Sequence, residues 1–208
     1  MSESLHPEEL ITSIIFLRHG HTKETEAGKL YTDHSSMLTE RGIEQAQRAT
    51  NWLKQTEVNL LLCSPAKRVL ATAEMLSQEL GLAPNIVTNL NEQFVGDWEG
   101  RTYLEIKKNE PEVYKTWSSD PIRNRPPNGE SIEDVYIRVE QDLSRVIHEN
   151  AGKKIILVTH AGVIRSALIS ALGMPLDNFW RLSIPTGSIS RVDYSHNFAT
   201  LHYMAQRP

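Results

Sequence analysis

Two strongly apolar segments that each run directly into a histidine constrain the fold of this chain most. Residues 11–17 lead into Arg18 and His19, and residues 153–159 lead into His160. Short apolar runs of this kind are typical of buried strands, and polar residues begin where each strand is expected to end. Because ligand sites of open α/β sheets lie at the carboxyl ends of strands, the sequence predicts a site at this edge of a sheet.

Elsewhere the chain alternates between strand-like runs and stretches with helical periodicity. Further strands are predicted at residues 58–64 and 86–90 and in a closing hairpin of residues 188–194 and 198–204. Helices are predicted after caps at Thr39, Ser64 and Ser131 and directly after His160. The first of these helices would bury one face, formed by Ile43, Ala46, Thr50 and Leu53. This alternation predicts the α/β class, as a three-layer sandwich with a mostly parallel central sheet and helices on both faces.

Residues 100–130 interrupt the alternation. They hold four prolines and lack a long helical period, so we expect a helical insertion that acts as a lid. The 208 residues are enough to bury a substantial core, and we expect residues 1–208 to form a single domain that carries this insertion.

The composition argues against several classes of partner. A net charge of -4 with 39% hydrophobic and 23% charged residues is ordinary for a globular protein and gives no bulk attraction for nucleic acid or an anionic membrane. The acidic N-terminal stretch with its short apolar run predicts neither a secretory signal nor a membrane span. The single cysteine, Cys63, fits a reducing compartment. We therefore expect a cytoplasmic protein.

Four predicted segments bring polar side chains to the same edge of the sheet. These side chains are Arg18, His19, Arg68, Glu92 and His160. The carboxyl ends of parallel strands share an edge, so residues far apart in the sequence can converge there. Two arginine forks suit the non-bridging oxygens of a phosphate, which makes a phosphate pocket the predicted site.

The residue types also suggest a route for phosphoryl transfer. A neutral His19 can attack phosphorus, and neighbouring cations favour its neutral form by lowering its pKa. Glu92, expected to be partly buried beside Phe94 and Trp98, would donate a proton to the departing oxygen and later activate water. The first N–H groups of the helix after His160, at Ala161 and Gly162, would attract the anion.

Six segments in this order resemble the histidine phosphatase superfamily, also called the phosphoglycerate mutase-like family. They read "LRHGHT", "LTERGIEQA", "CSPAKRVLATAE", "NEQFVGDWEGR", "PPNGES" and "VTHAGVIR". The resemblance implies that His19 is phosphorylated, that Arg18, Arg68 and His160 complete the phosphate pocket, and that Glu92 is the proton donor. It implies neither a metal nor a cofactor.

One position departs from the pattern of this family. Many members have asparagine where Thr25 stands, and the hydroxyl of Thr25 has a shorter reach toward phosphate. Thr22 matches the pattern and is expected to shape the loop. A metal site built from His19, His21, Asp33 and His34 is disfavoured because Gly20 breaks the strand. We expect His21 at the pocket mouth or exposed.

The leading prediction is a metal-independent phosphomonoesterase that acts through phosphohistidine on a small phosphorylated metabolite. The substrate types left open are α-ribazole phosphate, a sugar phosphate and phosphoserine. The alternatives are a cofactor-dependent phosphoglycerate mutase and a non-catalytic scaffold that binds a phosphorylated ligand. Substrate choice is expected to lie in residues 103–125, whose basic side chains could meet a second anionic group: Lys107, Lys108, Lys115, Arg123 and Arg125. The terminal hairpin would leave an edge through which a homodimer could form.

Overall fold

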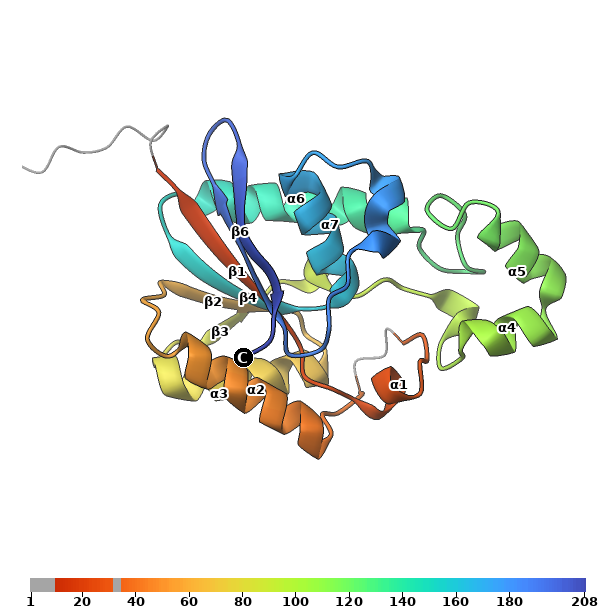
Figure 1. The fold of residues 1–208 in the computed structure, drawn as a ribbon, viewed down its shortest axis with the longest axis horizontal. Coiled ribbons are helices and arrows are strands. Elements are labelled where there is room, and N and C mark those ends of the chain that lie inside the picture. The colour runs from red at the N-terminus through yellow and green to blue at the C-terminus, as the bar shows by residue number, and fades with distance from the viewer. Residues whose placement is uncertain (1–9, 32–34) are drawn as a thin grey trace, which may run out of the picture.

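A six-stranded sheet runs through the part of the chain that the computed structural model describes, residues 10–31 and 35–208 (Figure 1). Its strands are β1 (Thr12–Arg18), β2 (Leu60–Cys63), β3 (Pro84–Ile86), β4 (Lys154–Thr159), β5 (Ile189–Tyr194) and β6 (Ala199–Gln206). The order across the sheet is β3-β2-β4-β1-β5-β6. The first four of these are parallel to one another, and β5 runs antiparallel to both β1 and β6, so the sheet is mostly parallel, as predicted.

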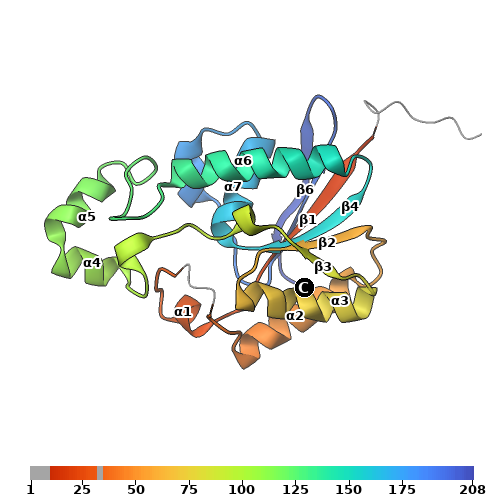
Figure 2. The same cartoon turned by 180° about the vertical axis from the view of Figure 1, so that it is seen from behind.

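Helices cover both faces of the sheet. The helices of the described chain are α1 (Lys23–Glu26), α2 (Glu40–Leu53), α3 (Lys67–Leu80), α4 (Tyr103–Asn109), α5 (Pro111–Ser118), α6 (Ile132–Glu149) and α7 (Ala161–Ala171), with 3₁₀ turns η2 (Thr88–Leu90), η3 (Gly96–Trp98) and η4 (Leu176–Arg181). Helices α2 and α3 lie on one face and α6 and α7 on the other, as Figures 1 and 2 show. The predicted three-layer α/β architecture is confirmed.

The central strand β1 explains how the layers are held together. Side chains alternate across a strand, so Ile14 and Phe16 pack in the cluster formed with α6 and α7, whereas Ile15 and Leu17 pack in the cluster formed with α2 and α3. All four are at most 2% exposed. A strand buried on both faces needs a continuous apolar run, which is what residues 11–17 provide.

The predicted caps hold at two of the three helices. The Thr39 hydroxyl accepts the Gly42 N–H at the start of α2, and Ser131 and Asp134 form a reciprocal capping box at the start of α6. The predicted cap at Ser64 was wrong, because α3 begins only at Lys67 and the Ser64 side chain turns inward.

Two other local predictions were also wrong. The third strand comprises Pro84–Ile86, and residues 88–90 of the predicted strand form the turn η2. Leu90 is fully buried and its carbonyl accepts the Thr159 hydroxyl, which draws the chain across the end of β4. Ile43, predicted on the buried face of α2, is 47% exposed.

The insertion is helical, as predicted, and it carries a small apolar core of its own. Helices α4 and α5 extend away from the sheet (Figure 1). Trp98 and Trp117 meet edge to face with ring centroids 5.1 Å apart, and Tyr103 stacks on Trp117. Val95 and Trp98 belong to the loop that follows Glu92, so this core joins the insertion to that loop.

No helix within residues 10–31 and 35–208 combines the length and the apolarity that crossing a membrane requires.

Candidate active site

The two histidines lie side by side at the carboxyl edge of the sheet. His19 follows β1 and His160 follows β4, which pairs in parallel with β1. Their ring centroids are 5.3 Å apart, and both rings are at most 1% exposed. The parallel pairing therefore brings together two side chains that are remote in the sequence, as expected.

His19 is oriented by its own loop. Its Nδ1 lies 2.8 Å from the carbonyl oxygen of Gly20, and because a carbonyl only accepts, Nδ1 carries the proton. Burial, followed by the charges of Arg18 and Arg68, holds the pKa of His19 well below its ordinary value. The ring is therefore neutral at pH 7, with the lone pair on Nε2.

His160 has the opposite tautomer. Its Nδ1 lies 3.4 Å from Nη2 of Arg68, and a guanidinium only donates, so Nδ1 accepts. The proton therefore sits on Nε2, which donates to the Ser64 hydroxyl at 2.7 Å. Burial, with smaller contributions from His19 and Arg68, lowers the pKa of His160. Ser64 was missed as a site residue because its position before Pro65 suggested a helix cap.

Two arginines lie beside the histidines, and the first of them, Arg18, is half-buried. Arg18 donates through Nη1 to the carbonyl of Ile184, and its buried Nε has no hydrogen-bond partner among the described residues. Arg68 is fully buried. Burial lowers the pKa of both guanidinium groups. Because an unpartnered buried donor is costly, this arrangement favours an anionic ligand next to His19.

Thr22 and Thr25 are engaged with a residue that the sequence analysis missed. The Tyr31 hydroxyl lies 2.7 Å from the Thr25 hydroxyl and 3.1 Å from that of Thr22. The Tyr31 ring lies 4.4 Å from the guanidinium carbon of Arg68, as a cation–π contact, and meets the His19 ring edge to face. Both threonines thus hold Tyr31 over the arginine, and their contact with phosphate stays a prediction.

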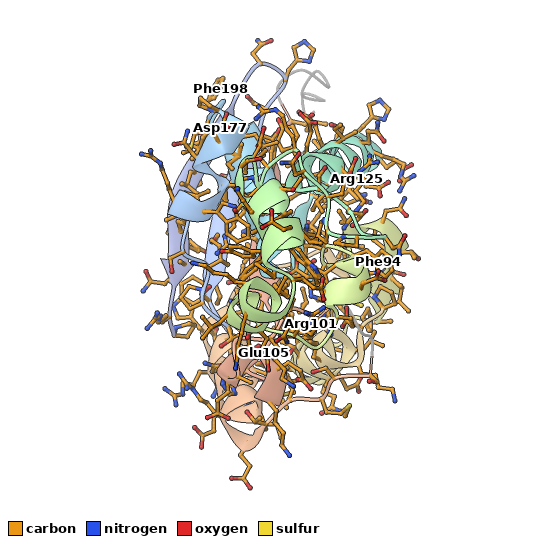
Figure 3. The ribbon with its side chains drawn as sticks, turned by 90° about the vertical axis from the view of Figure 1, so that its right-hand side faces the viewer. Phe94, Arg101, Glu105, Arg125, Asp177 and Phe198 are labelled. Atoms are coloured by element: carbon orange, nitrogen blue, oxygen red, sulfur yellow. The ribbon has the colours of Figure 1, made fainter. Side chains whose placement is uncertain are left out.

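Glu92 reaches the site from the loop after η2. Its Oε1 accepts the N–H groups of Gly162 and Gln93, each at 3.1 Å. The Gly162 N–H, expected to attract the phosphate, is therefore occupied by Glu92. The predicted apolar neighbours were also wrong: Phe94, which Figure 3 labels, has an exposed side chain, at 52%, and Trp98 packs in the core of the insertion.

A cavity of about 200 Å³ opens beside these residues. Its lining includes Arg18, Glu92, Ala161, Gly162, Lys29, Tyr31, Tyr103, Ile132, Arg165, Phe179 and Trp180. Arg165 was missed, although it ends the segment "VTHAGVIR" and its place on α7 puts it near His160. Its Nε donates to the Leu182 carbonyl, and its guanidinium lies 5.3 Å from the ring centroids of Phe179 and Trp180.

The basic residues of the insertion do not line this cavity. Arg123 pairs with Asp120 and Asp177, and Arg125 pairs with Asp134, so the predicted second-anion role of these two arginines was wrong. Residues 103–125 are all described, and Tyr103 is the one among them that lines the cavity. The lysines Lys107, Lys108 and Lys115 are exposed and lie outside it.

The residues of the alternative metal site are only partly placed. Asp33 and His34 lie outside the described residues. His21, expected at the pocket mouth or exposed, is buried, with its Nδ1 2.9 Å from the Thr39 hydroxyl oxygen.

Comparison with known proteins identifies the family. The model of the histidine phosphatase superfamily (branch 1) matches residues 14–207. The chain therefore belongs to the histidine phosphatase superfamily, as its six segments predicted.

Its relatives include named phosphatases. Adenosylcobalamin/alpha-ribazole phosphatase of Escherichia coli K12 is 34% identical over 192 residues, which make up 92% of this chain and 94% of that protein. Glucosyl-3-phosphoglycerate phosphatase of Mycolicibacterium vanbaalenii is 30% identical over 81% of this chain and 78% of its own length. The crystal structure of the alpha-ribazole phosphatase from Shigella flexneri has a TM-score of 0.86 and 32% identity, and the match covers 94% of this chain and 96% of that chain.

The neutral histidines predict a pH dependence of stability. The pKa of His19 and of His160 is lowered in the folded chain, so below about pH 6.5 the unfolded chain binds more protons. The free energy of unfolding should therefore fall as the pH drops from 7 to 5, by up to about 1.4 kcal/mol per pH unit for each histidine. Urea unfolding at a series of pH values gives the slope of the unfolding free energy against pH. This slope should be smaller for His160→Gln than for the wild type, and it should be unchanged for the control His148→Gln, an exposed histidine. Equal slopes in the wild type and both variants would contradict the prediction.

Gly162 is predicted to be needed for placing Glu92 rather than for folding. A Cβ at Gly162 would lie 2.3 Å from Oε1 of Glu92, the flexible end of a side chain that can swing away. Gly162→Ala should therefore keep or raise the melting temperature, since alanine favours a helix, yet lower kcat about tenfold or more. Wild-type kcat in this variant would show that the carboxylate does not act from this position.

Proposed function

We propose that this chain is a metal-independent phosphomonoesterase that forms a phosphohistidine at His19. The observation that carries the proposal is the neutral His19, with its proton fixed on Nδ1 and with the buried Arg68 and the half-buried Arg18 beside it. A lone pair on Nε2 is what an in-line attack on phosphorus requires, and the arginines neutralise the equatorial oxygens. The named phosphatases among its relatives support the same class of reaction.

The proposed reaction has two steps. Nε2 of His19 attacks phosphorus, the bond from phosphorus to the alcohol oxygen breaks, and that oxygen takes a proton from Glu92. The resulting carboxylate then takes a proton from water, whose oxygen attacks phosphorus as the bond to Nε2 breaks. The products are the alcohol, inorganic phosphate and the original enzyme. His160, whose ring is held by Ser64 and Arg68 beside that of His19, would lie next to the phosphoryl group during both steps.

The proposed substrate is a small phosphorylated metabolite, with α-ribazole phosphate as the first candidate. The relative named adenosylcobalamin/alpha-ribazole phosphatase is 34% identical over 92% of this chain, whereas the glucosyl-3-phosphoglycerate phosphatase is 30% identical over 81%. The cavity of about 200 Å³ suits a compact leaving group. The phosphoglycerate mutase would use the same residues but return the phosphoryl group to its substrate.

Formation of the phosphoenzyme is the direct test. Wild-type protein in excess EDTA should release phosphate from an aryl phosphate and carry a single acid-labile phosphate on His19, detected by mass spectrometry after an acid-free quench. His19→Ala should lose both signals, with circular dichroism to confirm that the variant folds. Loss of activity in EDTA would indicate a metal enzyme, a stable adduct from phosphoglycerate without hydrolysis would indicate the mutase, and neither adduct nor turnover would indicate the scaffold.

Arg165 is proposed to bind the leaving group. It lies in the cavity with Glu92, its Nε is held by Leu182, and it forms no salt bridge among the described residues. Its remaining N–H groups are therefore suited to an acceptor on the alcohol. For Arg165→Met, kcat/KM on α-ribazole phosphate should fall about tenfold more than on phenyl phosphate, whose alcohol has no second acceptor. Arg181→Met, an exposed arginine on η4, is the control; equal losses on the two substrates would refute this role.

Two further expectations remain proposals. Strand β6 is an edge of the sheet, which supports a homodimer formed through the hairpin, and a monomeric mass in light scattering would exclude it. Cytoplasmic localisation rests on the single buried cysteine, and cell fractionation tests it.

A further inference from the structure

The segment "PPNGES" has no part in the chemistry described so far, although it lies against the loop that carries Glu92. The N–H of Asp97 donates to the carbonyl of Pro127, and the N–H of Glu130 donates to that of Phe94. A Cβ at Gly129 would lie 2.8 Å from the Phe94 carbonyl oxygen. The two backbones are therefore in direct contact, and glycine is required at this crossing.

One arginine of α6 uses all its donors to bind the chain around Glu92 and the side chain of Glu130. Its contacts are Nη1 of Arg138 to the carbonyls of Asn89 (2.6 Å) and Asn91 (2.9 Å), Nη2 to the carbonyl of Glu92 (3.1 Å) and to Oε2 of Glu130 (3.0 Å), and Nε to Oε1 of Glu130 (2.9 Å). A guanidinium has five N–H groups, and each has a partner here. Three of the partners are main-chain carbonyls of the loop, including that of the acid itself.

Glu130 also contacts the two residues that follow Glu92, Gln93 and Phe94. Its Oε2 also accepts the N–H of Phe94 at 2.9 Å, and its carbonyl accepts Nε2 of Gln93 at 2.7 Å. The side chains of Glu130 and Arg138 are only 27% and 21% exposed, so water competes weakly for these bonds. The backbone of Glu92 is thus held by α6, and its carboxylate is held by the first turn of α7.

We infer that Arg138 and Glu130 are positioning residues for the proposed acid Glu92. A displacement of about 1 Å at a reacting group can cost about 100-fold in rate, and these contacts restrain the main chain of Glu92 directly. The inference rests on the proposed function, because it assigns importance to where the Glu92 carboxyl lies. It also gives the "PPNGES" segment a role: the segment supplies Glu130 and the glycine crossing that the loop rests on.

The test compares two leaving groups. 4-Nitrophenolate leaves without needing a proton, whereas a simple alkoxide needs one from a general acid. The quantity compared is kcat/KM, which covers only the steps up to release of the alcohol and leaves out hydrolysis of the phosphoenzyme, where Glu92 acts as the base for both substrates. For Arg138→Met, kcat/KM on an alkyl phosphate should fall about tenfold or more, and kcat/KM on 4-nitrophenyl phosphate less than about threefold. Arg138→Lys, which keeps the charge and some donors, should recover part of the loss. Arg125→Met removes an exposed ion pair at the start of the same helix and should leave both rates unchanged.

Each outcome decides the matter. Equal losses of kcat/KM on both substrates, or unchanged kcat/KM on the alkyl phosphate, would overturn the positioning role. If Arg138→Met fails to fold by circular dichroism, the same comparison is made with Glu130→Gln, which keeps the shape of the side chain. Glu92→Gln separates the two proposals: equal losses on both substrates there would refute Glu92 as the acid, whereas a leaving-group dependence for Glu92→Gln but not for the Arg138 and Glu130 variants would refute the positioning role alone.

Discussion

The burial of cationic side chains at the end of a parallel sheet is the constraint on which the site depends. Arg68 lies fully buried beside two histidines, and Arg18 lies half-buried beside them. Burial and mutual repulsion lower the pKa of each histidine, and the neutral rings leave one lone pair free on His19. The arrangement is costly without an anion, so the same charges that keep the proposed nucleophile neutral also favour an anionic ligand such as phosphate.

Close backbone contacts keep the loop after β1, which carries His19, in place. A Cβ at Gly20 would lie 2.3 Å from the carbonyl oxygen of Gly42, and one at Gly42 would lie 2.2 Å from that of His21. The loop after β1 therefore rests directly on the first turn of α2, where Thr39 also contacts His21. Two of the segments that identified the family, "LRHGHT" and "LTERGIEQA", are joined by this contact, which explains why each has its glycine.

The proposed acid, Glu92, is supported by different parts of the fold from the proposed nucleophile, His19. His19 is held by β1 and the loop after it. Glu92 is held by the first turn of α7, by Arg138 of α6 and by the loop that joins the insertion to α6. The cluster of Trp98, Trp117 and Tyr103 ties the same region to α4 and α5. Tyr103, which lines the cavity, thus packs against the loop that carries the proposed acid, Glu92.

Much of this structure follows from local sequence, and some of it does not. The apolar runs before His19 and His160 determined two neighbouring buried strands, and the family segments placed Arg18, Arg68 and Glu92 near them. Ser64, Tyr31 and Arg165 could not be recognised in this way, because a serine before a proline, a tyrosine in a polar loop and an arginine on a helix have ordinary local meanings. Their contacts with His160, Arg68 and the cavity arise from elements remote in the sequence.

The sequence by itself determined the class of fold, the family and the residue types of the site, because strand burial and helix capping depend on near neighbours along the chain. Tertiary structure alone decided the tautomers of the two histidines, the use of the Gly162 N–H by Glu92 and the contacts of Arg138. The His160 tautomer and the contacts of Gly162 and Arg138 depend on hydrogen bonds between residues remote in the sequence, and the His19 tautomer depends on the conformation of the loop that holds the Gly20 carbonyl against the ring. No local pattern encodes these distances.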